Sequence, residues 1–249
     1  MKELEDAIAK NNMVKAVDSV PWERLDRLKT DLSPELQTIL NQGGAIAARA
    51  MLPRGIDIAF DTTNPAAVSW VQQHAAELVT QNISPTTREA IRTLMEESFV
   101  QGITPAQTAR MIRDHIGILP RHVNAVLRYR EELLQRFPLE EAERRAQRYA
   151  QQLRNFRARM IARTETIRAS NQGQHELWRQ AMHDGLMNRE EWERIWIASD
   201  ACEICNSLHG TRAPMDGMFL CAFNGQSYKM PPDPHPQCRC ACGAVKKEE

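Results

Sequence analysis

The chain has 249 residues, with 32 basic and 32 acidic side chains and therefore no formal net charge at pH 7. The length allows one large domain or two smaller ones, and the balanced charge excludes a protein that binds polyanions through its whole surface. No apolar run approaches the roughly 20 residues that span a bilayer, so we expect no membrane partner. The first residues lack the apolar core of a signal peptide, so we expect the protein to reside in a reducing cytosol. In that compartment cysteines bind metal more often than they form disulfides.

Residues 1–57 are predicted to form an N-terminal segment of short helices and flexible connections. Ser33, directly before Pro34, is typical of a helix start, because a capping hydroxyl and an early proline both suit the first turn. The segment NQGGAIAARAMLPRG at 41–55 is rich in small residues and indicates a flexible connector. Nothing in this segment indicates chemistry.

Residues 58–137 are predicted to form a module of short helices packed as a bundle. Each helix start has proline at the first helical position, where the missing N–H costs no hydrogen bond. The starts are Asn64-Pro65, Ser84-Pro85, Thr104-Pro105 and Leu119-Pro120.

Residues 138–249 are predicted to contain a long helix followed by a small α+β unit. No proline interrupts 139–186, so we expect one long helix, or two helices that meet at a kink near 171–173. Alternation of polar and apolar residues at 193–198 indicates a strand, and alternation at 238–242 indicates another with three sulfurs on one face. The expected fold class is mainly α: a helical module with a long helix, followed by a small α+β C-terminal unit resembling a zinc knuckle.

Four residues of this unit form two close pairs: Cys202 with Cys205, and His235 with Cys238. A C-x-x-C turn presents two sulfurs to one ion, and a second pair from a distant loop completes a tetrahedral zinc site. We therefore predict these four residues as metal ligands and Zn2+ as a structural cofactor that contributes to the folding of the small unit.

Other donors lie nearby, and the ligand set stays open at this point. Cys240 is the main alternative to His235, while His209 and Cys221 are weaker alternatives. A filled set of four ligands argues against an enzyme, because catalytic zinc keeps one position for water.

Arginine is concentrated in the middle of the chain, where residues 101–170 contain fourteen Arg against seven Asp or Glu. One interpretation is a surface for DNA phosphates or an acidic protein. The more ordinary interpretation is a solvated helix face with ion pairs to nearby glutamates. Within the same region, Glu165 is placed to pair with Arg168 three residues later.

Three tryptophans flank the start of the cysteine-rich unit: Trp178, Trp192 and Trp196. They could stack on nucleic-acid bases. We expect them instead to pack the long helix against the small unit, because aromatic side chains supply much of the buried area of a small core.

Three segments carry a pattern of a known family: ARTETIRASNQG at 162–173, WIASDACEICNSLHG at 196–210 and PPDPHPQCRC at 231–240. This pattern resembles the phage Mu F-like minor head proteins, also called phage head morphogenesis proteins. The resemblance extends over roughly residues 60 to 246 and is strongest in the last ninety. The chain departs from the pattern in its additional Cys221 and Cys242, and in Asp233-Pro234, which lengthens the loop before His235 by one residue.

The resemblance implies a minor capsid protein in the interior of a tailed-phage virion, made in the host cytoplasm during assembly. It implies a position at the portal and a role in head morphogenesis, with DNA packaging, delivery or ejection as the later steps. The expected partners are the portal protein and the capsid or scaffold proteins, with packaged DNA as a further candidate. It implies no enzymatic activity.

Two alternatives stand beside this interpretation. The first is a nucleic-acid-binding zinc protein that uses the arginine-rich helix and the metal unit. The second is a zinc-dependent nuclease or an ADP-ribosyltransferase-like enzyme, which would use Asp200 with His209 or His235, or would use Glu165. A nuclease would need an open metal position or a second ion, and the spacing of these residues indicates neither.

Overall fold

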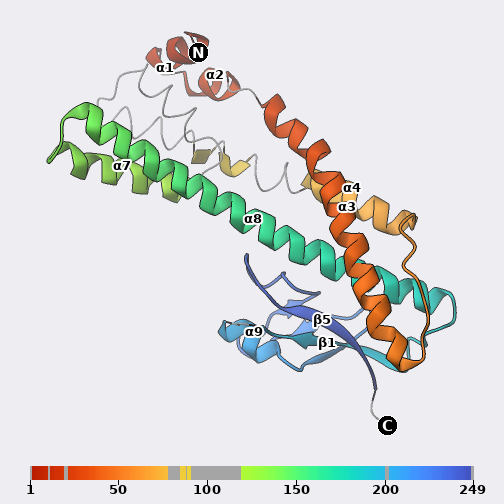
Figure 1. Cartoon of the computed structure of the whole chain (residues 1–249). Helices are drawn as coiled ribbons and strands as arrows, with labels where there is room; N and C mark the ends of the chain where they lie inside the picture. Colours follow the sequence, from red (N-terminus) through yellow and green to blue (C-terminus); the bar gives the residue numbers. More distant parts are fainter. Residues whose placement is uncertain are drawn as a thin grey trace. The chain divides into compact units, whose positions relative to one another are not determined.

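The structure is a computed structural model that describes residues 2–10, 12–19, 22–77, 85–87, 89–90, 119–199 and 202–247 (Figure 1). Its helices are α1 (Lys2–Ala9), α2 (Met13–Asp18), α3 (Glu23–Met51), α4 (Pro65–Glu77), α7 (Pro120–Leu134), α8 (Leu139–His183) and α9 (Glu203–Leu208), with a 3-10 turn η1 (Leu52–Arg54). Its strands are β1 (Trp192–Ile197), β2 (Arg212–Pro214), β3 (Phe219–Leu220), β4 (Ser227–Tyr228) and β5 (Ala241–Lys246). The described chain is mainly helical and has a small C-terminal sheet region, as the sequence predicted.

The chain forms two compact units that are interleaved in sequence. Unit 1 comprises Met1–Thr30 and Ala76–Arg159, and unit 2 comprises Asp31–Ala75 and Met160–Glu249. The interleaving arises because α3 and α8 each contribute residues to both units. The division into the three segments 1–57, 58–137 and 138–249 stays a prediction.

Helix α3 corrects two expectations for the N-terminal segment. Pro34 lies inside this 29-residue helix instead of starting one, and the segment expected to be a flexible connector forms its C-terminal part. The small residues allow close helix packing: a Cβ on Gly43 would lie 2.2 Å from the Ser170 carbonyl oxygen, and a Cβ on Gly173 would lie 1.9 Å from the Leu40 carbonyl oxygen. Contact with α8 therefore explains Gly43, and contact with the Phe60 ring explains Gly44.

Helix α8 runs without a break from Leu139 to His183, so the alternative of two helices with a kink at 171–173 is wrong. At that point the Asn171 side chain donates a hydrogen bond to the Ile167 carbonyl oxygen at 2.9 Å. The helix ends at His183, and Gly185, whose φ is 74°, then turns the chain. The N–H of Leu186 donates back to the Ala181 carbonyl.

Two of the four helix starts that were predicted from proline positions are confirmed. The starts of α4 and α7 are confirmed, and the side-chain oxygen of Asn64 accepts a hydrogen bond from the Ala66 N–H at 2.9 Å, as a cap does. Ser84 and residues 104–107 lie outside the described residues. None of the helices in the described parts of the chain combines the length and the apolar character that crossing a bilayer requires.

The main sheet is antiparallel, with strand order β2-β1-β5, and β3 and β4 form a separate pair. Strand β1 confirms the strand predicted at 193–198. The strand predicted at 238–242 is wrong in its start, because pairing with β1 begins at Ala241 opposite Ile197. Gln237, with a φ of 64°, turns the chain before that point. Only Cys242 of the three sulfurs therefore lies on the strand.

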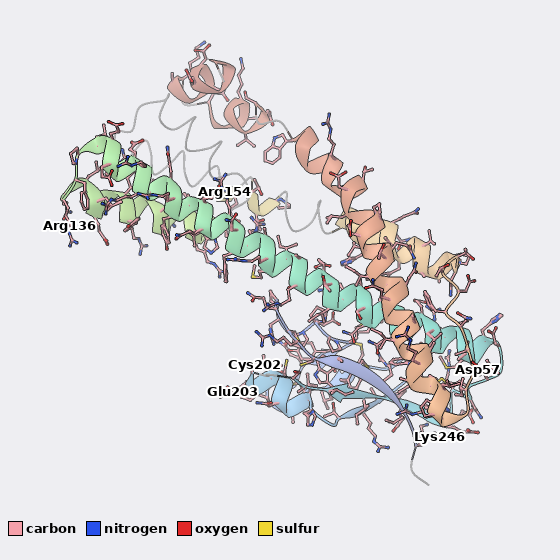
Figure 2. The ribbon with its side chains drawn as sticks, viewed as in Figure 1. Asp57, Arg136, Arg154, Cys202, Glu203 and Lys246 are labelled. Atoms are coloured by element: carbon pink, nitrogen blue, oxygen red, sulfur yellow. The ribbon has the colours of Figure 1, made fainter. Side chains whose placement is uncertain are left out.

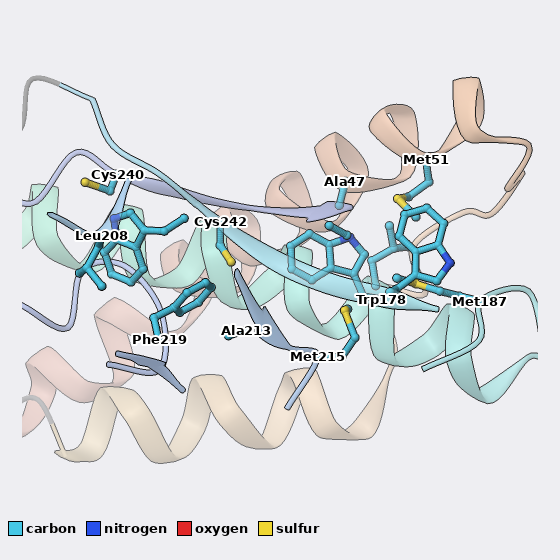
Figure 3. Packing of buried hydrophobic residues seen from close by; sticks show 14 of the residues in the cluster. Ala47, Met51, Trp178, Met187, Leu208, Ala213, Met215, Phe219, Cys240 and Cys242 are labelled. Atoms are coloured by element: carbon cyan, nitrogen blue, oxygen red, sulfur yellow. The ribbon is translucent and has the colours of Figure 1, made fainter. Parts of the chain in front are cut away.

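The core of unit 2 lies between the second half of α8 and the sheet. Trp178, Trp192 and Trp196 belong to one buried cluster, which confirms the predicted packing role. Figure 3 shows Trp178 near Met51 and Met187 at one end of this core. At the other end Phe219 meets Trp196 edge-on, with ring centroids 5.3 Å apart.

A buried cation links β1 to the loops around the β3–β4 pair. Arg194 is 1 % exposed, and its guanidinium donates to the carbonyl oxygens of Pro214 at 3.3 Å, Lys229 at 2.8 Å and Gly217. The guanidinium carbon also lies 5.1 Å from the centroid of the Phe219 ring. These contacts fix the start of the loop that follows β4.

Replacing Gly173 by Ala should destabilise the protein by about 2 kcal/mol or more, because the new methyl group would overlap the Leu40 carbonyl across the helix crossing. The free energy of unfolding from urea titration measures this effect. At an exposed helical position without such a neighbour, the same change stabilises by about 1 kcal/mol. A control is Ala162→Gly at an exposed site on α8, which should cost about that amount. A stabilised Gly173→Ala variant would contradict the close crossing.

Candidate metal centre

The predicted ligands come from two places in unit 2. Cys202 is the N-cap residue of α9, and Cys205 lies on the first turn of that helix, so the local fold turns both sulfurs the same way. Figure 2 marks Cys202 and Glu203 at this helix start. His235 and Cys238 lie in the loop between β4 and β5, which we call the metal loop (residues 229–240).

The two places meet at Cys205. The Nε2 atom of His235 lies 3.2 Å from the sulfurs of both Cys202 and Cys205, and the Cys205 sulfur lies 3.7 Å from the Cys238 sulfur. Cys202, Cys205 and His235 form one group with donor atoms within 4.8 Å of one another, and Cys205, Cys238 and Cys240 form a second. Tetrahedral zinc with bonds of about 2.3 Å holds two sulfurs about 3.8 Å apart, and the Cys205–Cys238 distance fits this value.

The protonation of His235 suits metal binding. Its Nδ1 atom lies 2.9 Å from the carbonyl oxygen of Pro236, and a carbonyl only accepts, so Nδ1 carries the proton. Nε2 therefore presents its lone pair toward the two sulfurs. A hydrogen bond from the second ring nitrogen to a carbonyl is the usual support of a metal-bound histidine.

The electrostatics of the buried thiols also favour a cation. Burial raises the pKa of the Cys205 thiol well above its ordinary value, and burial raises that of Cys238 to about 11. Without a nearby cation these thiols stay protonated, whereas a bound metal ion converts them to thiolates. A donor set of thiols and one imidazole suits a soft or borderline ion such as Zn2+ and does not suit Mg2+ or Ca2+.

The weaker candidates have other partners. The Nδ1 atom of His209 accepts a hydrogen bond from the Ala198 N–H at 3.1 Å, which joins the end of β1 to α9. The Cys221 sulfur lies 3.0 Å from the Ser207 hydroxyl oxygen. Among the described residues, neither His209 nor Cys221 belongs to a group of candidate metal donors.

The metal loop is attached to α8 through the ARTE segment. The N–H of Gln237, the residue between His235 and Cys238 with the left-handed φ, donates to the Thr164 hydroxyl at 3.0 Å. One turn after the ARTE segment, Arg168 donates to an Asp233 oxygen at 3.5 Å. Helix α8 therefore supports the loop on both sides of His235.

Asp233, which belongs to the loop extension of this chain, also closes the loop on itself. Its second carboxylate oxygen accepts hydrogen bonds from the N–H groups of Lys229 and Met230, each at 3.2 Å. The longer loop therefore keeps His235 within 3.2 Å of the cysteines of α9.

Glu165 is already engaged inside unit 2. It contacts His74 of α4 directly, and Arg168 lies 3.7 Å away, as its spacing predicted. The His74 ring stacks on Trp70 with centroids 4.7 Å apart. Sequence reasoning missed His74, because 91 residues separate it from Glu165 and no local pattern joins them. Asp200, the other carboxylate considered for catalysis, lies outside the described residues.

Comparison with known proteins identifies the family. The model of the family described as phage Mu protein F like protein matches residues 89–243, which include the ARTE segment, α9 and the metal loop. Searches among curated proteins and among solved structures gave no match. The matched range exceeds half of the chain and contains the residues that carried the sequence resemblance, so the chain belongs to the phage Mu F-like family.

Proposed function

We propose that this chain is a minor capsid protein of a tailed phage, with a role in head morphogenesis. Its membership of the phage Mu F-like family is the observation that carries the proposal. The proposed location is the capsid interior, with the host cytoplasm as the site of assembly. The proposed partners are the portal protein and the capsid or scaffold proteins, and the later steps of DNA packaging and ejection would follow from a portal position.

The proposed cofactor is one structural Zn2+ ion held by Cys202, Cys205, His235 and Cys238. The donor chemistry, the protonation of His235 and the burial of the thiols support it. Bound zinc would cross-link α9 to the metal loop and add its binding energy to the folding of a unit with short strands. Four protein ligands leave no position for water, which favours a structural role over a nuclease.

The zinc proposal predicts one ion per chain and a hierarchy among variants. Cys205→Ser should abolish zinc retention during dialysis and lower the melting temperature, because Cys205 belongs to both donor groups. Elemental analysis and thermal unfolding measure these effects. Cys221→Ala is the matched control and should retain one ion, since Cys221 lies outside both groups.

The choice between His235 and Cys240 as the fourth zinc ligand can also be tested with variants. His235→Ala should weaken zinc binding at least tenfold in a chelator competition, whereas Cys240→Ser should leave the affinity near that of the parent. The reverse pattern would assign the fourth position to Cys240.

The contacts of Asp233 predict an effect on the rate at which the same ion is lost. Arg168→Gln and Asp233→Ala should each accelerate zinc loss to a chelator about 10-fold or more, because the loop that carries His235 loses its support while every ligand remains. Arg163→Gln, at an exposed position on the same helix, is the control and should match the parent. Equal rates in all four proteins would show that the loop needs no such support.

The head-protein proposal is tested in the particle itself. Quantitative mass spectrometry of purified virions and of DNA-free proheads from the source phage should find a few copies per particle in both. Cross-linking should then connect the chain to the portal. Absence from both particles would refute the proposal and would direct attention to a host-acting role.

A further inference from the structure

Positive charge is concentrated in one helical hairpin of unit 1. The chain as a whole has no net charge, but residues 119–159, which include α7 and the first part of α8, contain ten Arg, five Glu and neither Lys nor Asp. The positive field also acts on a half-buried histidine: the pKa of His122 is lowered by partial burial and by the neighbouring Arg121 and Arg157. The hairpin therefore presents a positive surface, while acidic residues exceed basic ones in the rest of the chain.

A groove follows the junction of the two helices in this hairpin. It has a volume of about 750 Å3, and its walls come in equal parts from α7 and α8. Tyr129 of α7 and Tyr149 of α8 meet edge-on inside it, with ring centroids 5.3 Å apart. Arg128, Arg145 and Arg148 contribute to its lining, against one carboxylate, that of Glu132.

Half of the ten arginines of the hairpin have hydrogen-bond or ion-pair partners within the protein. Arg130 pairs with Glu143 at 2.9 Å, and Arg145 pairs with Glu141 at 2.6 Å while lying over the Phe137 ring. These side chains fix the hairpin, which agrees with the ordinary interpretation of an arginine-rich helix.

Two groove arginines belong to the other half. Within the part of the chain that the structure describes, the guanidinium groups of Arg128 and Arg148 have no hydrogen-bond or ion-pair partner, and the same holds for the hydroxyls of Tyr129 and Tyr149. Arg128 and Arg148 are also exposed. The groove therefore offers donors from both of its walls to a ligand with many acceptors.

We propose that this groove binds the phosphate backbone of a nucleic acid strand. Guanidinium forks match phosphate oxygens, and neighbouring tyrosines supply hydroxyl donors and ring surfaces for bases. From Ala125 to Glu132 the α7 wall extends for about 10 Å, since a helix rises about 1.5 Å per residue. That length suits a short stretch of one strand, enough for the two phosphates that Arg128 and Arg148 would contact. The inference deepens the proposed head function, on which it rests for the source of the nucleic acid.

The test compares two double variants of the full chain that lose the same charge. Arg128→Gln/Arg148→Gln removes the groove donors. Arg136→Gln/Arg159→Gln removes two exposed arginines that do not line the groove, and Figure 2 marks Arg136 at the turn between the helices. Anisotropy of a short fluorescent DNA single strand and of its duplex gives the affinity at several salt concentrations, and circular dichroism verifies that each variant is folded.

The groove variant should bind the single strand at least 10-fold more weakly than the parent. Its salt slope should fall by about 1.4, which corresponds to two phosphate contacts on a single strand. The control variant should stay within about 2-fold of the parent, and Tyr149→Leu should weaken the single strand more than the duplex if bases stack on this ring.

Three results would overturn the inference. The first is an absence of DNA binding by the parent chain, and the second is an equal loss of affinity in the two double variants, which would indicate charge alone. The third is tighter binding of poly-glutamate than of DNA, with loss in the groove variant, which would assign the groove to an acidic protein. These measurements use the purified chain, so their failure is distinguishable from absence of the chain in virions.

Discussion

The contact between the metal loop and the second half of α8 determines where the candidate ligands lie. The loop has little regular structure of its own, and bonds to α8 hold it on both sides of His235: the Gln237 N–H donates to the Thr164 hydroxyl, and Arg168 donates to the Asp233 carboxylate. The long helix therefore positions the loop that carries two of the candidate ligands.

That dependence gives the ARTE segment a physical role beyond sequence similarity. Its threonine supports the loop, while its glutamate is bound by His74 and Arg168 and so joins α4 to the same network. Polar groups in such a network are costly to bury alone and become favourable when every member has a partner.

Local sequence signals predicted the parts of the fold that local physics decides. Asn64-Pro65 and Leu119-Pro120 mark helix starts because capping and proline geometry act within one turn. The alternation around Trp192 marked β1 for the same reason.

The errors arise where a distant segment overrides the local signal. The glycines of α3 suggested a flexible connector, but Gly43 faces a carbonyl group of α8, more than a hundred residues later, and Gly44 faces the Phe60 ring. The start of β5 was placed too early because the turn at Gln237 depends on Thr164. The Cys and His pairs were evident from spacing, yet spacing did not reveal that Cys205 belongs to two donor groups.

The interleaving of the two units has a consequence for synthesis on the ribosome. The apolar residues Leu36, Leu40 and Val71 emerge early, but their cluster includes Ala169, and the larger core of unit 2 also needs residues after 177. The early segment must therefore wait for about a hundred further residues, which takes roughly 5–20 s at ordinary elongation rates. During that interval its apolar face lacks its native cover, so chaperone capture and pairing between neighbouring nascent chains compete with folding. Elongation speed, as well as sequence, thus sets the yield of native protein.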